Sequence, residues 1–567
     1  MPTFQGLGGP DLDSLRPCPA EALQTLDSFP PMHPRRLPRV FACAVLFLAP
    51  CFVHAKQQAR PNILFAIADD WSFGHASIHG CRWVSTPSFD RVAREGVLFT
   101  RTYTPNAKCS PSRSSILTGR NPWQLEAAAN HTPVFPAAYK TFPEALAENG
   151  YFVGMVGKGW GPGEAKDFNG NPREMAGRPF NKKQTPAPTS AMSNNDYSAN
   201  FEDFLNAAPA GQPWCFWYGG FEPHRNYEYG SGVAKGGKRL ADIDRVPAFW
   251  PDTEEVRNDM LDYAFEVEHF DRTLGKMLAR LEALGELDNT FVLVTSDNGM
   301  PFPRAKGQDY EIANHLPLAI RWPAGIPKAG RTVDDFVSFI DYAPTIADVA
   351  QVSWGKLGMA PATGRSFMDI LKSERTGQVD PTRDHVILGR ERNDVGRPND
   401  EGYPVRSIVK GGLVYSHNFE ADRWPTGNPE TGYRDCDSSP TKTTIIHAHR
   451  QNSTDPFWAL CFGKRGSEEL FDLKNDPDCV QNLSAKPEYS ALKAALSQQL
   501  MAELKAQQDP RVLGKGLEIE AYPYANADRD FYSRFIKNGL GPTPKKGHGI
   551  SIDDFDPPPP EIKQKAE

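Results

Sequence analysis

Polar residues follow two apolar runs of the sequence, 63–68 and 291–294, close to the point where each run ends. Together they supply three carboxylates and one amide, at Asp69, Asp70, Asp297 and Asn298. Ca²⁺ and Mg²⁺ prefer hard oxygen ligands of this kind, whereas softer metals prefer nitrogen and sulfur. A single pair of aspartates is as often a helix cap or a solvated loop, but two pairs at two strand ends favour a metal site.

Cationic side chains and a histidine follow two further apolar runs, 152–156 and 215–218. Lys158 comes two residues after the first run, and His224 comes six residues after the second. Lys158 and Lys306 could neutralise the oxygens of an anion and the charge that develops on a leaving group. His224 could give a proton to a leaving oxygen or nitrogen near neutral pH. Most lysines are solvated surface charges, but positions beside strand-end motifs favour a functional interpretation.

A thiol, a proline turn and an arginine lie within five residues of one another in the run CSPSR at 109–113. The run LTGR follows at 117–120, after three spacer residues. A single cysteine before a helix is usually a small buried side chain. Arg113 lies one helical turn after Cys109, where it could hold the side chain of residue 109 by hydrogen bonds.

The four apolar runs have the length of strands and are apolar on both faces, which suits the central strands of a mostly parallel sheet. Between the runs 215–218 and 291–294, Thr253 is expected to cap a long amphipathic helix that continues to Leu278. Alternating strands and helices over 60–375 predict a doubly wound α/β domain. Ligand sites of such sheets gather at the carboxyl ends of the strands, so the polar clusters should converge on one pocket.

The rest of the chain has a different composition. Residues 161–195 are rich in Gly, Pro, Asn and Lys, which predicts a long irregular insertion. Over 385–510, short β-rich pieces and a strand near 469–473 precede a helix expected at 487–505, which indicates a smaller C-terminal α+β domain. Residues 511–567 include four consecutive prolines and are expected to be extended or disordered.

Length and charge narrow the class of protein. The chain has 567 residues and a formal net charge of −7, which suggests more than one domain and argues against nucleic-acid binding. Residues 32–55 have a basic start, a short apolar run and a small-residue ending, as in a secretory signal cleaved after Ala55. The apolar run is too short for a stable membrane span. Residues 1–31 show no coherent pattern and are interpreted as a gene-model extension or a disordered segment. We therefore expect an exported protein.

Six cysteines would remain after cleavage at Ala55: Cys81, Cys109, Cys215, Cys436, Cys461 and Cys479. Exported proteins tend to pair their cysteines. We expect a disulfide between Cys436 and Cys461, although spacing alone does not determine connectivity.

The pattern C-x-P-S-R followed by L-T-G-R resembles the signature of the type I sulfatases, a family with an alkaline-phosphatase-like fold. The resemblance covers residues 60 to about 505. It implies that a maturase oxidises Cys109 to formylglycine, and that residue 109 joins the aspartates and Asn298 around a bound Ca²⁺, with Mg²⁺ as the alternative. It also implies a sulfated carbohydrate as substrate, and it indicates no particular oligomeric state.

Within that family, the chain resembles the heparan N-sulfatases. The segments that carry this similarity are SDNGMPFP at 296–303, PHR at 223–225, YPVRS at 403–407, ELFD at 469–472 and NDP at 475–477. The similarity implies hydrolysis of N-sulfates or sulfate esters of a sugar such as glucosamine.

The sequence departs from the family pattern in three places. Trp160 stands where the family has a histidine two residues after the lysine, and an indole cannot act as a base. His131 and His315 are the candidates to replace that histidine. Arg392 lies in a segment where heparan N-sulfatases carry a substrate-contacting histidine, so we expect it to touch substrate. Lys306 stands where they have arginine, and a lysine lacks the bidentate fork.

Two other functions stay open. A phosphatase or phosphodiesterase of the same superfamily would need Ser or Thr as nucleophile, and it usually has two metals with additional histidines. A pseudo-sulfatase that binds sulfated glycans without turnover is suggested by Trp160.

Overall fold

The computed structural model describes residues 60–538 and 551–556, which belong to one compact unit. The expected gene-model extension at 1–31 and the expected signal peptide at 32–55 lie outside the described residues. Within the described part, no helix has both the length and the apolar character that a bilayer span requires.

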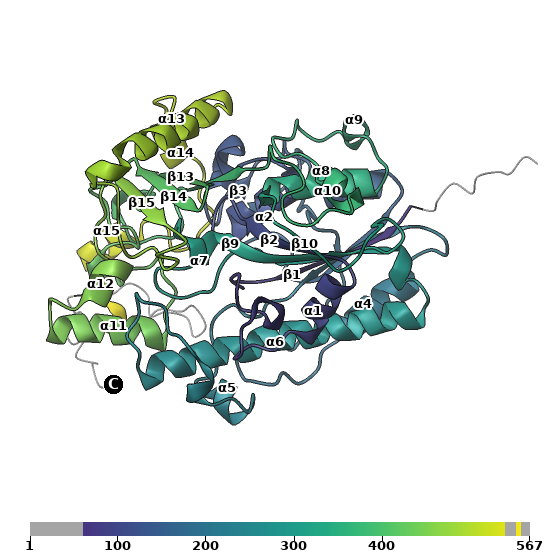
Figure 1. Cartoon of the computed structure of the whole chain (residues 1–567), viewed down its shortest axis with the longest axis horizontal. Coiled ribbons are helices and arrows are strands. Elements are labelled where there is room, and N and C mark those ends of the chain that lie inside the picture. Colours follow the sequence, from purple (N-terminus) through teal and green to yellow (C-terminus); the bar gives the residue numbers. More distant parts are fainter. Residues whose placement is uncertain (1–59, 539–550, 557–567) are drawn as a thin grey trace, which may run out of the picture. The chain divides into compact units, whose positions relative to one another are not determined.

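A nine-stranded mixed sheet has the strand order β10-β2-β9-β8-β1-β7-β4-β6, with β11 paired to β2. Figure 1 shows β1, β2, β9 and β10 of this sheet in the middle of the fold. Its strands are β1 (Asn62–Ala68), β2 (Val97–Tyr103), β4 (Phe152–Gly157), β6 (Arg178–Pro179), β7 (Trp214–Gly219), β8 (Thr290–Ser296), β9 (His315–Arg321), β10 (Arg331–Val333) and β11 (Val337–Ser338). The four predicted apolar runs are β1, β4, β7 and β8, and they run parallel to one another. β9 runs antiparallel to β2 and β8. The mixed α/β class is therefore confirmed.

Helices cover both faces of this sheet because alternate residues of its strands point to opposite sides. Leu64 and Ala66 of β1 pack in one hydrophobic cluster, and Ile63 and Phe65 pack in the other. The first face carries α1 (Pro87–Arg94), α4 (Tyr197–Ala207) and α6 (Glu254–Ala283). The second face carries α2 (Cys109–Thr118), α3 (Phe142–Glu148), α8 (Tyr342–Val349) and α10 (Met368–Lys372). The predicted cap of α6 is confirmed, since Thr253 accepts a hydrogen bond from the Val256 amide.

A second, four-stranded antiparallel sheet is formed by β12 (His385–Arg390), β13 (Val405–Lys410), β14 (Leu413–Asn418) and β15 (Glu468–Asp472). α13 (Ser490–Ala506) packs on it through Leu496, Leu500 and Leu504, whose four-residue spacing places them on one face of the helix. Two more helices, α11 (Pro440–Gln451) and α12 (Pro456–Cys461), lie between β14 and β15 in the chain. This arrangement agrees with the predicted C-terminal α+β part.

The chain after residue 510 differs from our expectation of an extended or disordered tail. It forms α14 (Gly516–Glu520) and α15 (Phe531–Asn538). Arg511 donates hydrogen bonds to Glu391 and Glu520, both at 2.7 Å, and thereby fastens this segment to the preceding part of the chain. Composition does not reveal ion pairs between residues this far apart. Residues 557–567 lie outside the described part.

The insertion at 161–195 is irregular, as predicted. Its only strands are the two-residue β5 (Glu164–Ala165), which pairs with β3 (Val134–Phe135), and β6 at the edge of the large sheet. The short helices α5 (Ser231–Ala234), α7 (Glu311–Asn314) and α9 (Trp354–Leu357) complete the described helices.

The predicted disulfide between Cys436 and Cys461 is wrong, because all six described cysteines are free thiols. The two thiols point to different backbone acceptors. Cys461 donates to the carbonyl of Phe249 at 3.3 Å, and Cys436 donates to that of Asp437 at 3.6 Å. Both side chains are buried in the same hydrophobic cluster and behave as small apolar residues.

Candidate active site

Side chains from four strand ends meet at one edge of the large sheet. These are Asp69 and Asp70 after β1, Asp297 and Asn298 after β8, Lys158 after β4 and His224 after β7. The Asp297 amide donates to the Ala68 carbonyl at 3.2 Å, and the Asp69 amide donates to the Glu222 carbonyl at 3.2 Å. Since these bonds connect the ends of neighbouring strands, the order β8-β1-β7 fixes the relative positions of the groups.

Three carboxylates form the centre of the site. Asp69, Asp70 and Asp297 are almost fully buried, and each offers an oxygen within 4.8 Å of the others. Asn298 donates its Nδ2 to Asp70 at 2.6 Å, while its Oδ1 is buried without a hydrogen-bond partner. Buried acceptors normally have partners. Three like charges and an unsatisfied oxygen therefore fit a hard divalent cation. We call these four residues the strand-end cluster.

Each of the three carboxylates also has its own cation. The pairs are Lys158–Asp69 at 2.6 Å, Lys306–Asp70 at 2.7 Å and Arg113–Asp297 at 2.7 Å. Arg113 additionally donates to the carbonyls of Lys158 and Gly159, at 2.9 and 2.7 Å. The guanidinium of α2 therefore connects the ends of β4 and β8.

The three carboxylates titrate differently. Burial raises the pKa of Asp70 to about 6, although Lys306 works against this. Burial likewise raises the pKa of Asp297 to about 6 against the influence of Arg113. For Asp69, burial is outweighed by Lys158 and the other nearby cations, which hold its pKa well below the ordinary value.

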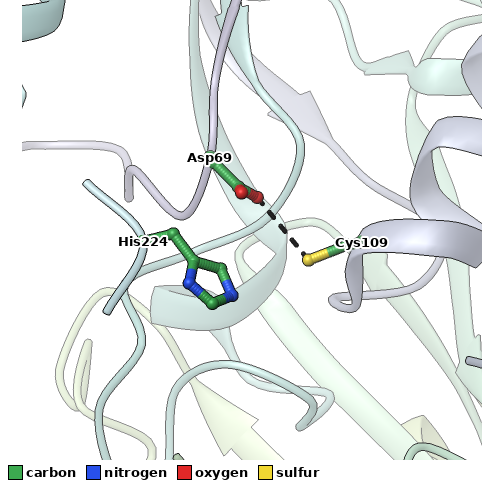
Figure 2. A group of neighbouring side chains, drawn as sticks. All are labelled: Asp69, Cys109 and His224. Carbon is green, nitrogen blue, oxygen red and sulfur yellow. Dashed lines mark hydrogen bonds between the residues drawn. The ribbon is translucent and has the colours of Figure 1, made fainter. Parts of the chain in front are cut away.

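Cys109 is the first residue of α2, and its thiol lies 3.5 Å from Asp69 Oδ1 (Figure 2). Figure 2 shows the thiol, the carboxylate and the ring of His224 approaching one another from three separate segments. Burial raises the pKa of Cys109 to about 12. Only a thiolate is strongly nucleophilic. The unmodified side chain is therefore protonated at neutral pH and poorly suited to attack a substrate.

His224 is the most open member of the site, with 37% of its side chain exposed. Its Nε2 lies 4.0 Å from Asp70 Oδ2, and its Nδ1 donates to the carbonyl of Arg225. Burial and Lys306 lower the pKa of His224 to about 4, so the free site holds a neutral imidazole. Binding of an anion beside it would raise that pKa and favour the protonated, donating form.

Arg225 anchors the loop that carries His224. Its guanidinium makes a bidentate ion pair with Asp259 of α6, at 2.7 and 2.8 Å, and donates to the Pro301 carbonyl at 2.7 Å. It also lies between the rings of Tyr227 and Phe302, 4.4 and 4.3 Å from their centres. One planar side chain thus joins the His224 loop to the segment after the strand-end cluster.

Trp160 occupies the position of the absent histidine, and its polar atom bonds to a serine of α2. Its Nε1 donates to Ser114 Oγ of α2 at 2.9 Å, and its ring packs edge-on against Phe135 at 5.3 Å. The indole therefore supports α2, and the described structure gives it no polar contact with Cys109.

The two histidines considered as replacements lie in different surroundings. His315 bonds Glu311 and the Thr100 carbonyl through its two nitrogens, at 2.6 and 2.8 Å, so neither nitrogen is available. His131 contacts Asp394 through Nδ1 at 3.2 Å, and its Nε2 is buried without a partner.

Arg392 does not join the charged groups around Cys109. Its guanidinium lies 4.0 Å above the ring of Tyr524 and donates to the Tyr522 carbonyl at 3.4 Å. The structure therefore gives Arg392 a role in fastening the C-terminal segment, unlike the substrate contact that we expected.

Sequence reasoning missed three charged residues of the site. Lys108, directly before Cys109, pairs with Asp394 at 2.8 Å, and Asp437 lies 3.1 Å from Lys306. The position of Lys108 beside the CSPSR run was a readable signal. The two aspartates lie on loops near the small sheet, and only the packing of that sheet region on the large one brings them here.

A mixed sheet with a cation-lined carboxylate cluster at its strand ends suits an enzyme that binds an anionic group beside a divalent metal ion. The comparison with known proteins narrows this class. The family model described as Sulfatase matches residues 61–352. The chain belongs to the sulfatase family and is a sulfuric ester hydrolase by that membership.

Individual proteins that are similar to this chain differ from it at most aligned positions. An ulvan-active sulfatase of Formosa agariphila is 26% identical over 464 residues, covering 79% of this chain and 81% of the relative. The human N-sulphoglucosamine sulphohydrolase is 26% identical over 494 residues, covering 81% and 92%. A solved structure in complex with its substrate D-glucosamine-2-N,6-O-disulfate superposes with a TM-score of 0.55 at 21% identity, covering 79% of this chain and 98% of that one.

Proposed function

We propose that this protein removes sulfo groups, as sulfate esters or N-sulfates, from a carbohydrate, by means of a formylglycine made from Cys109 and a bound Ca²⁺. The observation that carries this proposal is the position of Cys109. Its buried, protonated thiol lies 3.5 Å from Asp69, where an unmodified cysteine could do little chemistry.

The residues present fit the metal. Asp69, Asp70, Asp297 and Asn298 would hold it together with the side chain at position 109, since the orphaned Asn298 Oδ1 and the carboxylate oxygens are hard donors. The donor set also suits Mg²⁺. A bound cation would offset the mutual repulsion of the carboxylates and stabilise negative charge on a sulfo group.

The other residues handle charge and protons. An aldehyde at position 109 would supply an oxygen nucleophile once water has added to it; departure of sulfate would regenerate the aldehyde, which a new water molecule would hydrate. Lys158 and Lys306 are placed to neutralise the oxygens of a sulfo group. His224 Nε2 is the atom placed to carry a proton to the leaving oxygen or nitrogen once an anion raises its pKa. Arg113 holds the carbonyls beside Lys158 in place.

The relatives support a sulfated glycan as substrate. They include a human N-sulphoglucosamine sulphohydrolase and an N-acetylglucosamine-6-O-sulfatase of Bacteroides thetaiotaomicron. We propose a glycosaminoglycan-type sugar, with N-sulfoglucosamine as the first candidate because of the segments around 223–225 and 296–303. We also propose export after cleavage near Ala55 and maturation by a formylglycine-generating enzyme.

Trp160 favours a second candidate, a pseudo-sulfatase that binds sulfated glycans without turnover. Its indole gives the site no base at the position where the family has a histidine, and its N–H is committed to Ser114.

Sulfate release from glucosamine N-sulfate and N-acetylglucosamine 6-sulfate tests the proposal, with Cys109→Ala as the matched inactive variant. We expect the protein with Cys109 to release sulfate and the variant to release none. The mass of the peptide that contains residue 109 should correspond to formylglycine in place of cysteine. Turnover that survives Cys109→Ala would exclude this mechanism. Glycan binding without release would instead establish the pseudo-sulfatase.

A further inference from the structure

Two carboxylates face the site from the side of the small sheet. Asp394 lies on the loop after β12, and Asp437 lies just before α11. Each keeps part of its side chain accessible, 21% and 23%, although each is ion-paired with a buried lysine, Lys108 or Lys306. The Oδ2 of Asp437, which faces Lys306 at 3.1 Å, is buried and accepts no hydrogen bond from the described residues. With His131, we call Asp394 and Asp437 the acidic wall.

His131 gives a second, independent indication of a ligand. The residue is only 8% exposed, and its Nε2 is buried without a partner. Its Nδ1 lies 3.2 Å from Asp394, so the carboxylate favours the tautomer in which Nδ1 donates and Nε2 accepts. The neighbouring Thr132 amide donates to Ser110 Oγ at 3.4 Å, which places this loop beside the start of α2 and Cys109. A buried polar atom in this position normally has a partner.

The wall belongs to the same electrostatic environment as the strand-end cluster. Lys306 and Lys108 outweigh the effect of burial and hold the pKa of Asp437 below its ordinary value. Lys108 is the main influence that does the same for Asp394. Both wall carboxylates are therefore ionised at neutral pH. Asp437 offers a carboxylate oxygen within 4.8 Å of a ring nitrogen of His224, the proposed proton donor to the leaving group, so this end of the wall lies beside the leaving group.

This arrangement divides the pocket by charge. The inner part, with Lys158, Lys306 and Arg113, attracts one anionic group. The wall adds acceptors, namely the carboxylate oxygens that Lys108 and Lys306 do not pair with and the Nε2 of His131. Carboxylates bind hydroxyl and ammonium groups by strong charge-assisted hydrogen bonds, whereas a second anion against them would be repelled in a poorly solvated site.

We propose that Asp394, Asp437 and His131 bind the hydroxyl or amino groups of the sugar ring that carries the sulfo group, and that they disfavour rings with a second sulfo or carboxylate group beside it. The proposal rests on the proposed sulfatase function. It assigns the wall to substrate selection, separately from the chemistry at Cys109.

The test uses the full chain with Cys109→Ala, saturated with Ca²⁺, so that sugars bind without turnover. Isothermal titration would compare glucosamine N-sulfate with glucosamine N,6-disulfate. We expect the monosulfated sugar to bind about tenfold more tightly, as the repulsion of one desolvated charge suggests. Adding Asp437→Asn or Asp394→Asn, which keep the shape of the side chain, should reduce that ratio several-fold.

Asp380→Asn is the matched control, because Asp380 has the same 21% exposure and an ion pair with Arg365 but contacts none of the site residues. It should leave the ratio unchanged. Equal binding of the two sugars, or a ratio of affinities that neither wall variant alters, would overturn this proposal. The proposed sulfatase function would still stand if the protein with Cys109 in place released sulfate. Absence of both binding and release would overturn the two together.

Discussion

The strand-end cluster and the acidic wall both place carboxylates beside lysines, yet they are built in different ways. Asp69, Asp70 and Asp297 follow directly from adjacent parallel strands and are almost fully buried. Asp394 and Asp437 lie on loops at the small sheet and stay partly accessible. Since strand register leaves little freedom and loops leave more, the first region suits invariant chemistry and the second suits selection among substrates.

The largest contrast should come from removing one carboxylate of each region. Asp297→Asn removes a proposed metal ligand and the shorter of the two ion pairs of the buried Arg113, which keeps only its 3.5 Å contact with Asp69. We expect the rate of sulfate release to fall by more than about a hundredfold, since even residues behind metal ligands change activity by about 10- to 100-fold. Asp437→Asn should lower it far less. Similar losses in steady-state assays of both variants would contradict the distinction between the two regions.

Metal removal should affect only the strand-end cluster. At a free Ca²⁺ concentration of about 100 times the dissociation constant, binding adds about 2.7 kcal/mol to the free energy of unfolding. Thermal unfolding with EDTA and with Ca²⁺ measures this difference. The Asp394→Asn variant should still be stabilised by Ca²⁺, whereas the Asp70→Asn variant should not. The metal assignment fails if neither Ca²⁺ nor Mg²⁺ stabilises the unsubstituted protein.

Arg225 belongs to neither the strand-end cluster nor the acidic wall, but it positions His224. Arg225→Lys keeps the charge but loses the bidentate pair with Asp259 and the bond to the Pro301 carbonyl. We expect kcat to fall about tenfold with a smaller change in KM, and the loss should be greater for substrates with poor leaving groups. A variant in which kcat is unchanged would show that His224 needs no such anchor.

The smallest effect concerns His385, which lies outside both regions and serves as a pH control. Burial opposes its charge, but hydrogen bonds to Glu503 and Asp384 raise its pKa above 6.5. The stabilisation is therefore fully present below about pH 6.5 and is lost as pH rises through the folded-state value. Urea unfolding of His385→Asn should show less than about 1 kcal/mol of lost stability at pH 6 and less still at pH 9. An equal loss at both pH values would exclude this titration.

The sequence predicted the large sheet well because its central strands are apolar on both faces and end in polar clusters. Asp69, Lys158 and Asp297 could be found in this way, since register alone brings the ends of β1, β4 and β8 together. It could not show which distant loops cover those ends. Asp394 and Asp437 stand in segments without periodicity, and their partners are more than a hundred residues away.

Two other differences have the same physical origin. Arg392 lay in a suggestive segment, but its guanidinium stacks on Tyr524, in a stretch that composition assigned to an unstructured tail. We expected a disulfide between Cys436 and Cys461 because exported proteins tend to pair their cysteines. In the structure, each thiol instead donates to a nearby backbone carbonyl. Tertiary contacts therefore determined what composition and spacing left open.

All ten residues of α2 are buried, beginning with Cys109. An enzyme that modifies this cysteine cannot reach it once the helix has packed against the sheet. The proposed conversion would then have to take place before the chain folds. Two molecules with the same sequence and the same fold could therefore differ permanently in activity, according to whether that conversion took place before they folded.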